Sequence, residues 1–90
     1  MLLVSYDISN DKLRTSFAKF LSKYGYRLQY SVFEIKNSDR IIENITTKIE
    51  KYFGERFEQS DSVIIFILSN TCRKIQFGYA RNSENGLIIM

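Results

Sequence analysis

Two helical patterns of apolar residues, separated by a β-prone segment, constrain most strongly what this chain can fold into. In residues 11–24 and again in residues 39–53, apolar side chains recur every three or four positions, which is the spacing of one face of a helix. Gly25 and Gly54 follow the two patterns. Because a left-handed glycine often ends a helix, we expect the helices to stop at these two residues.

The remaining apolar segments predict β-strands. Residues 2–8 and 63–68 are apolar and β-prone, and a weaker strand pattern covers residues 71–77. Residues 26–36 are also β-rich, but a single straight strand would mix charged and aromatic side chains on one face. A bend or turn near residues 30–31 resolves this conflict, so we predict two short strands joined as a hairpin.

The resulting order is β-α-β-β-α-β followed by a C-terminal extension, which is typical of an α+β, ferredoxin-like domain. We assign the domain to residues 1–80 and a tail to residues 81–90, where residues 87–90 could form a strand added to a partner protomer. Two helices cover one face of such a sheet, yet residues 63–68 are apolar without interruption. The simplest cover for the other face is a second copy, so we predict a homodimer with its sheets face to face.

Composition sets limits on location and chemistry. A net charge of +3 permits a polyanionic partner without proving one. Cys72 is the only cysteine, which excludes an intrachain disulfide and fits a reducing cytoplasm. No segment has the roughly twenty apolar residues of a membrane span. The chain contains no histidine, so Ser-His-Asp catalysis and histidine-ligated zinc are excluded.

Asp7 is the first candidate for chemistry, because it ends the first predicted strand where a loop begins. A carboxylate at such a position can hold a hard cation such as Mg²⁺. One carboxylate makes a poor site, but a dimer axis could bring two together. The alternative is that Asp7 only caps the following turn.

The second candidate is a basic set that could bind the phosphates of a duplex without reading its sequence. Its members are Lys12, Arg14, Lys19, Lys23, Arg27, Lys36 and Arg40. The alternative is an ordinary solvated surface. The aromatic residues Tyr6, Tyr30 and Phe33 could stack on bases or belong to the core.

Three segments of the chain resemble the CRISPR-associated protein two family: residues 4–8 (VSYDI), residues 13–14 (LR) and above all residues 25–34 (GYRLQYSVFE). The last segment is the specific one, and it follows a predicted helix as the family requires. The resemblance covers about the first eighty residues.

The resemblance implies a ferredoxin-like homodimer that binds double-stranded DNA and bridges dimers of a CRISPR-associated integrase during spacer acquisition. It also implies an alternative activity, a metal-dependent endonuclease acting on RNA or DNA. The residues that this activity would use are Tyr6, Asp7, Arg14, Arg27 and Phe33, with Asp7 as the Mg²⁺ ligand at the dimer axis.

Two other functions share this fold. Small toxin ribonucleases remain an alternative that the sequence does not separate from the CRISPR functions. A small-molecule regulatory module would need a glycine-rich ligand loop, and the four glycines of this chain are isolated from one another.

Overall fold

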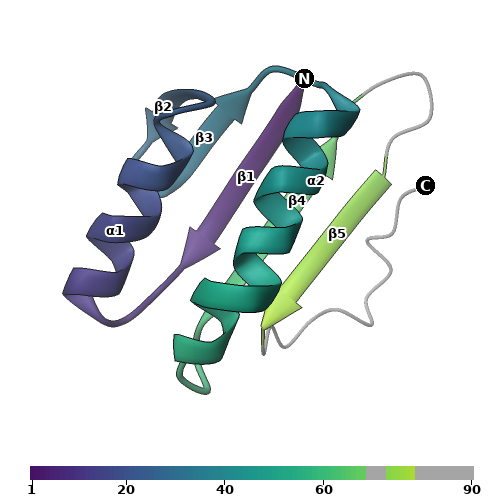
Figure 1. The fold of residues 1–90 in the computed structure, drawn as a ribbon. Helices are drawn as coiled ribbons and strands as arrows, with labels where there is room; N and C mark the ends of the chain where they lie inside the picture. The colour runs from purple at the N-terminus through teal and green to yellow at the C-terminus, as the bar shows by residue number, and fades with distance from the viewer. Residues whose placement is uncertain (69–72, 79–90) are drawn as a thin grey trace.

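The computed structural model describes residues 1–68 and 73–78. Along the chain run β1 (Leu2–Asp7), α1 (Asp11–Leu21), β2 (Gly25–Gln29), β3 (Val32–Ile35), α2 (Asp39–Lys48), a π-helix η1 (Ile49–Phe53), a 3-10 turn η2 (Gly54–Arg56), β4 (Ser62–Ile67) and β5 (Arg73–Gly78). The predicted β-α-β-β-α-β order with a further strand is confirmed (Figure 1). The predicted tail, residues 81–90, lies outside the described residues.

The strands form one antiparallel sheet in the order β2-β3-β1-β4-β5. β1 lies at its centre, paired with β3 on one side and with β4 on the other. The predicted hairpin is also confirmed, because β2 and β3 are joined by a two-residue turn at residues 30–31. The register shifts between Arg27 and Gln29, which is the irregularity that the broken alternation indicated.

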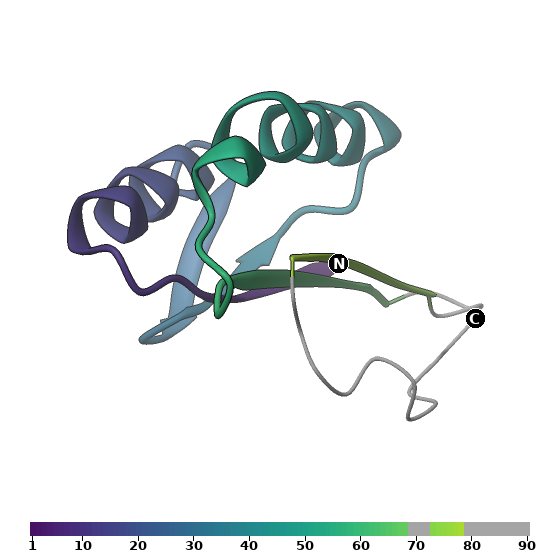
Figure 2. The same cartoon turned by 90° about the horizontal axis from the view of Figure 1, so that it is seen from below.

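Both helices lie on one face of the sheet, as Figure 2 shows. Side chains of a strand alternate between its two faces, so β1 turns Leu2, Val4 and Tyr6 toward the helices, where each is at most 4 % exposed. Phe17 of α1 packs edge-on against Phe53 of the π-helix, with ring centroids 4.8 Å apart. These contacts build the core between helices and sheet.

We call the other side of the sheet the open face, because no helix of the described residues covers it. Register assigns to it Leu3, Ser5 and Asp7 of β1, Val32 and Glu34 of β3, Ser62, Ile64 and Phe66 of β4, and Lys74 and Gln76 of β5. Its apolar members are half-buried rather than buried. β4 therefore has one fully buried face and one partly exposed apolar face.

The structure corrects our expectation for Gly25 and Gly54. Neither has a positive φ; among the described residues, Gly78 alone does. α1 ends at Leu21, and Gly25 instead begins β2, where a Cβ would lie only 2.0 Å from the carbonyl oxygen of Glu34. Close strand approach, not helix termination, requires this glycine. Gly54 continues the helical path from the π-helix into the 3-10 turn, with φ −60°.

Candidate nucleic-acid interface

Four of the five residues singled out by resemblance gather on the helix side of the sheet. Tyr6 lies between Phe17 and Phe33, with ring centroids at 5.1 and 6.3 Å. Arg27 pairs with Phe33 across the hairpin, and its guanidinium carbon lies 5.4 Å from that ring centroid. Tyr6 and Phe33 are core residues, as one of our two alternatives held, whereas Arg27 is exposed.

Arg14 joins this group from the first turns of α1. Its guanidinium donates to the carbonyl oxygen of Ile8 at 3.0 Å and forms an ion pair with Asp11. The hydrogen bond with Asp11 raises the pKa of Arg14. Arg14 is therefore held beside the β1–α1 connection, with its charge partly balanced by Asp11. Arg27 presents its charge at the exposed β2 edge of the sheet.

Tyr6 has an altered acidity as a result of its position. Burial raises the pKa of its hydroxyl above the ordinary value of 10.0, while the positive charge of Arg27 acts in the opposite direction. At neutral pH Tyr6 is therefore a neutral phenol inside the core. It can donate or accept a hydrogen bond, but it does not supply a negative charge.

Asp7 lies apart from these four residues. It follows Tyr6 in β1 and therefore points to the open face, where it pairs with Ser62 of β4 and is exposed. Arg27 pairs with Phe33 and therefore lies on the other side of the sheet, and Arg14 belongs to α1, which covers that same side. The N-cap of α1 is Asn10, whose side chain accepts from the Leu13 amide at 2.8 Å.

The surroundings of Asp7 indicate whether one chain alone could bind the expected Mg²⁺. Among the described residues, no three carboxylates or cysteines come together as a metal site would require. One chain thus offers a single exposed carboxylate there, which does not fit a Mg²⁺ site by itself. A second chain would have to supply the other ligands.

The basic set divides between the layer that α1 and α2 form on the sheet, which we call the helix layer, and the rest of the surface. Lys23, in the turn after α1, and Arg40 of α2 line one hollow of about 930 Å³ between the two helices. Lys12 and Lys19 are exposed on α1, and Lys36 is exposed directly after β3. Two lysines outside the predicted basic set, Lys48 and Lys51, also line this hollow, together with the carboxylate of Glu43. The helical spacing of these two lysines in residues 39–53 was the available signal.

Sequence reasoning also missed Asp61, the buried carboxylate of the described chain. Asp61 is 0 % exposed and accepts from the Ser9 amide at 2.9 Å, the Ser9 hydroxyl at 3.0 Å and the Glu58 amide at 2.8 Å. It ties the β1–α1 connection to the segment that leads into β4. Asp61 thus holds Ser9, which follows Ile8, the residue whose carbonyl oxygen accepts from Arg14. Its position in a polar connection gave no signal in the sequence.

Comparisons with known proteins address the identity of this fold. A family model described as CRISPR associated protein Cas2 matches residues 1–75. The chain belongs to the Cas2 family. Among curated relatives, the CRISPR-associated endoribonuclease Cas2 2 of Methanospirillum hungatei is 34 % identical over 74 residues, covering 80 % of this chain and 76 % of the relative.

Two further matches agree with that assignment. The CRISPR-associated endoribonuclease Cas2 3 of Chloroflexus aurantiacus is 43 % identical over 49 residues, covering 54 % of this chain, and the match spans about half of that relative (53 %). A crystal structure of a hypothetical protein, TT1823 from Thermus thermophilus, matches with a TM-score of 0.66 and 28 % identity, covering 78 % of this chain and 82 % of that one. The resemblance to the Cas2 family is thus confirmed, and nuclease names occur among its members.

One further observation concerns membranes. Within residues 1–68 and 73–78, none of the helices combines the length and the apolar character needed to cross a bilayer.

Proposed function

We propose that this Cas2 protein is a dimeric scaffold that binds duplex DNA through its cations and bridges integrase dimers during spacer acquisition. One observation carries the proposal: the cations of the helix layer and the apolar open face lie on opposite sides of the sheet. A dimer formed through the open face would leave both helix layers exposed. Duplex phosphates could then contact Lys12, Lys19 and Lys23 of each copy.

The composition of the open face supports the dimer. Leu3 lies opposite Phe66, and Ile64 lies on the same face of β4 two residues before Phe66, so the apolar side chains are contiguous across β1 and β4. Val32 of β3 lies beyond Ser5 on the same face. A contiguous apolar patch on a small domain favours association, because water is released when the patch is covered. A second copy has the complementary surface by symmetry.

The helix layer supports binding to the phosphate backbone. Lys19 is exposed near the end of α1, Lys23 is exposed in the turn that follows, and Arg40 lines the same hollow as Lys23. Lysines on a helix surface offer point charges without the fixed geometry that base recognition needs. The binding that we propose is therefore independent of DNA sequence and sensitive to salt.

Equilibrium binding of a labelled duplex, measured at several salt concentrations, tests this function. The variant Lys19→Ala/Lys23→Ala should bind more weakly. The slope of log K against log salt should become shallower by about 4, close to one unit per lost phosphate contact, because each copy of the dimer loses two contacts. The variant Asp7→Asn is the control and should bind like the wild type. An unchanged slope in the lysine variant would contradict the proposal.

The bridging step has its own test. The dimer should co-elute with the integrase of the same CRISPR locus, and the complex should acquire spacers with Asp7→Asn as well as with the wild type. Spacer acquisition that is lost in Asp7→Asn, with the dimer and the integrase complex intact, would exclude a purely structural role.

A second candidate is a Mg²⁺-dependent endonuclease, favoured by the exposed position of Asp7 at the end of β1. A second copy stacked on the open face would bring its own Asp7, and the pair could then ligate the metal. This activity predicts cleavage of RNA or DNA that stops with a chelator and in Asp7→Asn. Cleavage that persists in Asp7→Asn would rule out this candidate.

A further inference from the structure

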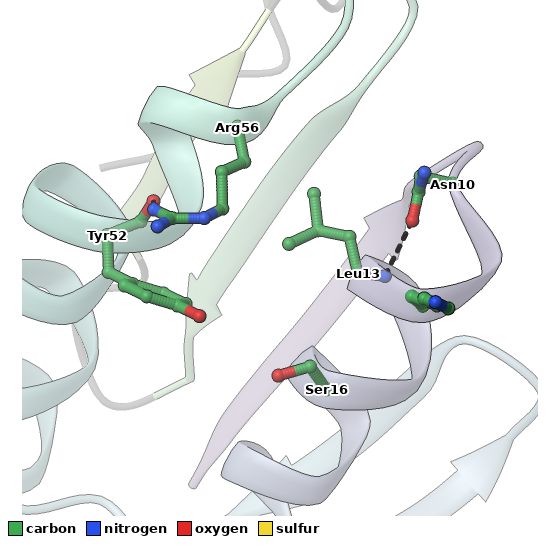
Figure 3. Close-up of a pocket in the computed structure, with 6 residues that line it drawn as sticks. Asn10, Leu13, Ser16, Tyr52 and Arg56 are labelled. Carbon is green, nitrogen blue, oxygen red and sulfur yellow. Dashed lines mark hydrogen bonds between the residues drawn. The ribbon is translucent and has the colours of Figure 1, made fainter.

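A second hollow, of about 400 Å³, lies between the start of α1 and the end of the π-helix, and of its lining residues only Lys12 has a role in the functions proposed above. Figure 3 shows Leu13 and Ser16 on one side of it and Tyr52 and Arg56 on the other. Asn10 and Lys12 complete its lining. Its volume lies in the lower part of the range of small-molecule sites, about 300–1,000 Å³.

The π-helix shapes one wall of this hollow. Ile49 and Phe53 are both buried, and Phe53 packs on Phe17 and Phe20 of α1 with centroids at 4.8 and 5.5 Å. This packing sets the spacing between the helices. Tyr52, one residue before Phe53, is left on the surface beside the hollow, 36 % exposed. Isolated π-turns within helices are frequent at functional sites.

Arg56 is preorganised on this wall. Its guanidinium carbon lies 3.9 Å from the ring centroid of Tyr52, and it donates to the carbonyl oxygen of Tyr52 at 2.8 Å. Lys48 lies over the same ring at 4.6 Å. A guanidinium has five N–H donors, and within the described part of the chain Arg56 uses one of them, in the hydrogen bond to Tyr52. The others are available to an anion.

The charges around the hollow select an anionic ligand. Lys12 and Arg56 come from two different elements, and none of the six lining residues is a carboxylate. In the described part of the chain, the one ion pair is between Arg14 and Asp11, so Lys12 and Arg56 are not paired there. Two cations and the hydroxyl of Ser16 match a doubly charged phosphate, while the apolar side chain of Leu13 suits a sugar or base.

The neighbouring hollow indicates which phosphate ester would fit. Tyr52 lines both hollows, and the lining of the larger one includes four cations, Lys23, Arg40, Lys48 and Lys51, against one carboxylate, Glu43. A ligand that places a phosphate between Lys12 and Arg56 could therefore extend over further cations. We propose that this hollow binds the terminal nucleotide of a single strand, together with its phosphomonoester, and that the backbone of the strand follows the larger hollow between α1 and α2. This inference rests on the nucleic-acid binding proposed above.

The site is tested by measuring the binding of three labelled single-stranded DNAs of about ten nucleotides. One carries a phosphate at its 5′ end, one carries a phosphate at its 3′ end, and one has hydroxyls at both ends. One phosphorylated form should bind about tenfold more tightly than the hydroxyl form. Ser16→Asp, which puts a negative charge into the hollow, should abolish this preference. Thr15→Asp is the matched control, because it adds the same charge at the adjacent exposed position of α1, and it should retain the preference.

Arg56→Ala provides a second variant and should also lose the preference, with circular dichroism showing that both variants are folded. Binding of adenosine monophosphate distinguishes a strand end from a free nucleotide. If adenosine monophosphate binds tightly to the wild type but not to Ser16→Asp, the hollow binds a free nucleotide, and the proposed strand end is wrong. Equal binding of all three strands to the wild type, with duplex binding intact, would overturn the inference alone. Loss of all nucleic-acid binding would instead contradict the proposed function.

Discussion

Tyr6 and Asp7 are adjacent in β1 but lie on opposite sides of the sheet. Tyr6 is 4 % exposed and packs against Phe17 at 5.1 Å, whereas Asp7 is exposed on the open face. The two residues share one sequence motif, so a catalytic unit containing both would have to act through the thickness of the sheet. The structure instead divides the motif into a core aromatic residue and a surface carboxylate.

The first prediction concerns Tyr6 and alkaline pH. Because burial raises its pKa above 10.0, the stabilising effect of the neutral phenol is fully present below pH 10 and is lost as pH rises through the raised pKa. Tyr6→Phe should cost about 1 kcal/mol at neutral pH, because the hydroxyl contacts are lost. Above pH 10, its free energy of unfolding should fall less steeply than that of the wild type. Urea unfolding at a series of pH values measures both curves, and parallel curves above pH 10 would contradict the assignment.

The second prediction concerns Asp61. Asp61→Ala removes the acceptor for two backbone amides and one hydroxyl in a site that is 0 % exposed. Buried donors without an acceptor are costly, so the free energy of unfolding should fall by about 3 kcal/mol. Glu55→Ala, an exposed acid in the same connection, should change it by less than about 0.5 kcal/mol. If the two variants unfold at the same urea concentration, the proposed role of Asp61 is wrong.

The third prediction concerns Gly25. A Cβ at this position would lie 2.0 Å from the carbonyl oxygen of Glu34, so Gly25→Ala must push β2 away from β3. The expected cost is about 2–3 kcal/mol. Gln29→Ala, at an exposed position of the same strand, should be nearly neutral. Equal thermal melting of Gly25→Ala and the wild type would show that the hairpin adjusts more easily than its geometry indicates.

Much of the fold was predictable because its signals are local. The helical spacing of Phe17 and Leu21, the alternation in β1 and the broken pattern before Ser31 each depend on near neighbours in sequence. The ends of the helices were less predictable. Gly25 and Gly54 were expected to be left-handed, but the first is required by a strand 9 residues away along the chain and the second continues a widened helix.

The candidate site was predicted as a list of residues but not as an arrangement. Resemblance singled out Tyr6, Asp7, Arg14, Arg27 and Phe33 without indicating that Asp7 faces away from the others. Asp61 gave no signal, because its partners are 52 residues away at Ser9 and three away at Glu58. The hollow at Tyr52 depends on a π-turn, and the helical spacing of residues 39–53 did not reveal where the helix widens.

The central claim is that two copies pair through the open face, and sedimentation equilibrium tests it most directly. At micromolar concentrations the wild type should show about twice the 10.6 kDa mass of one chain, and Phe66→Glu should show the mass of one chain. Tyr52→Glu changes an aromatic residue that is 36 % exposed on the π-helix, on the opposite side of the sheet from the open face, and should remain a dimer. The claim would be contradicted if the wild type sedimented with the mass of one chain, or if the Phe66→Glu variant still dimerised.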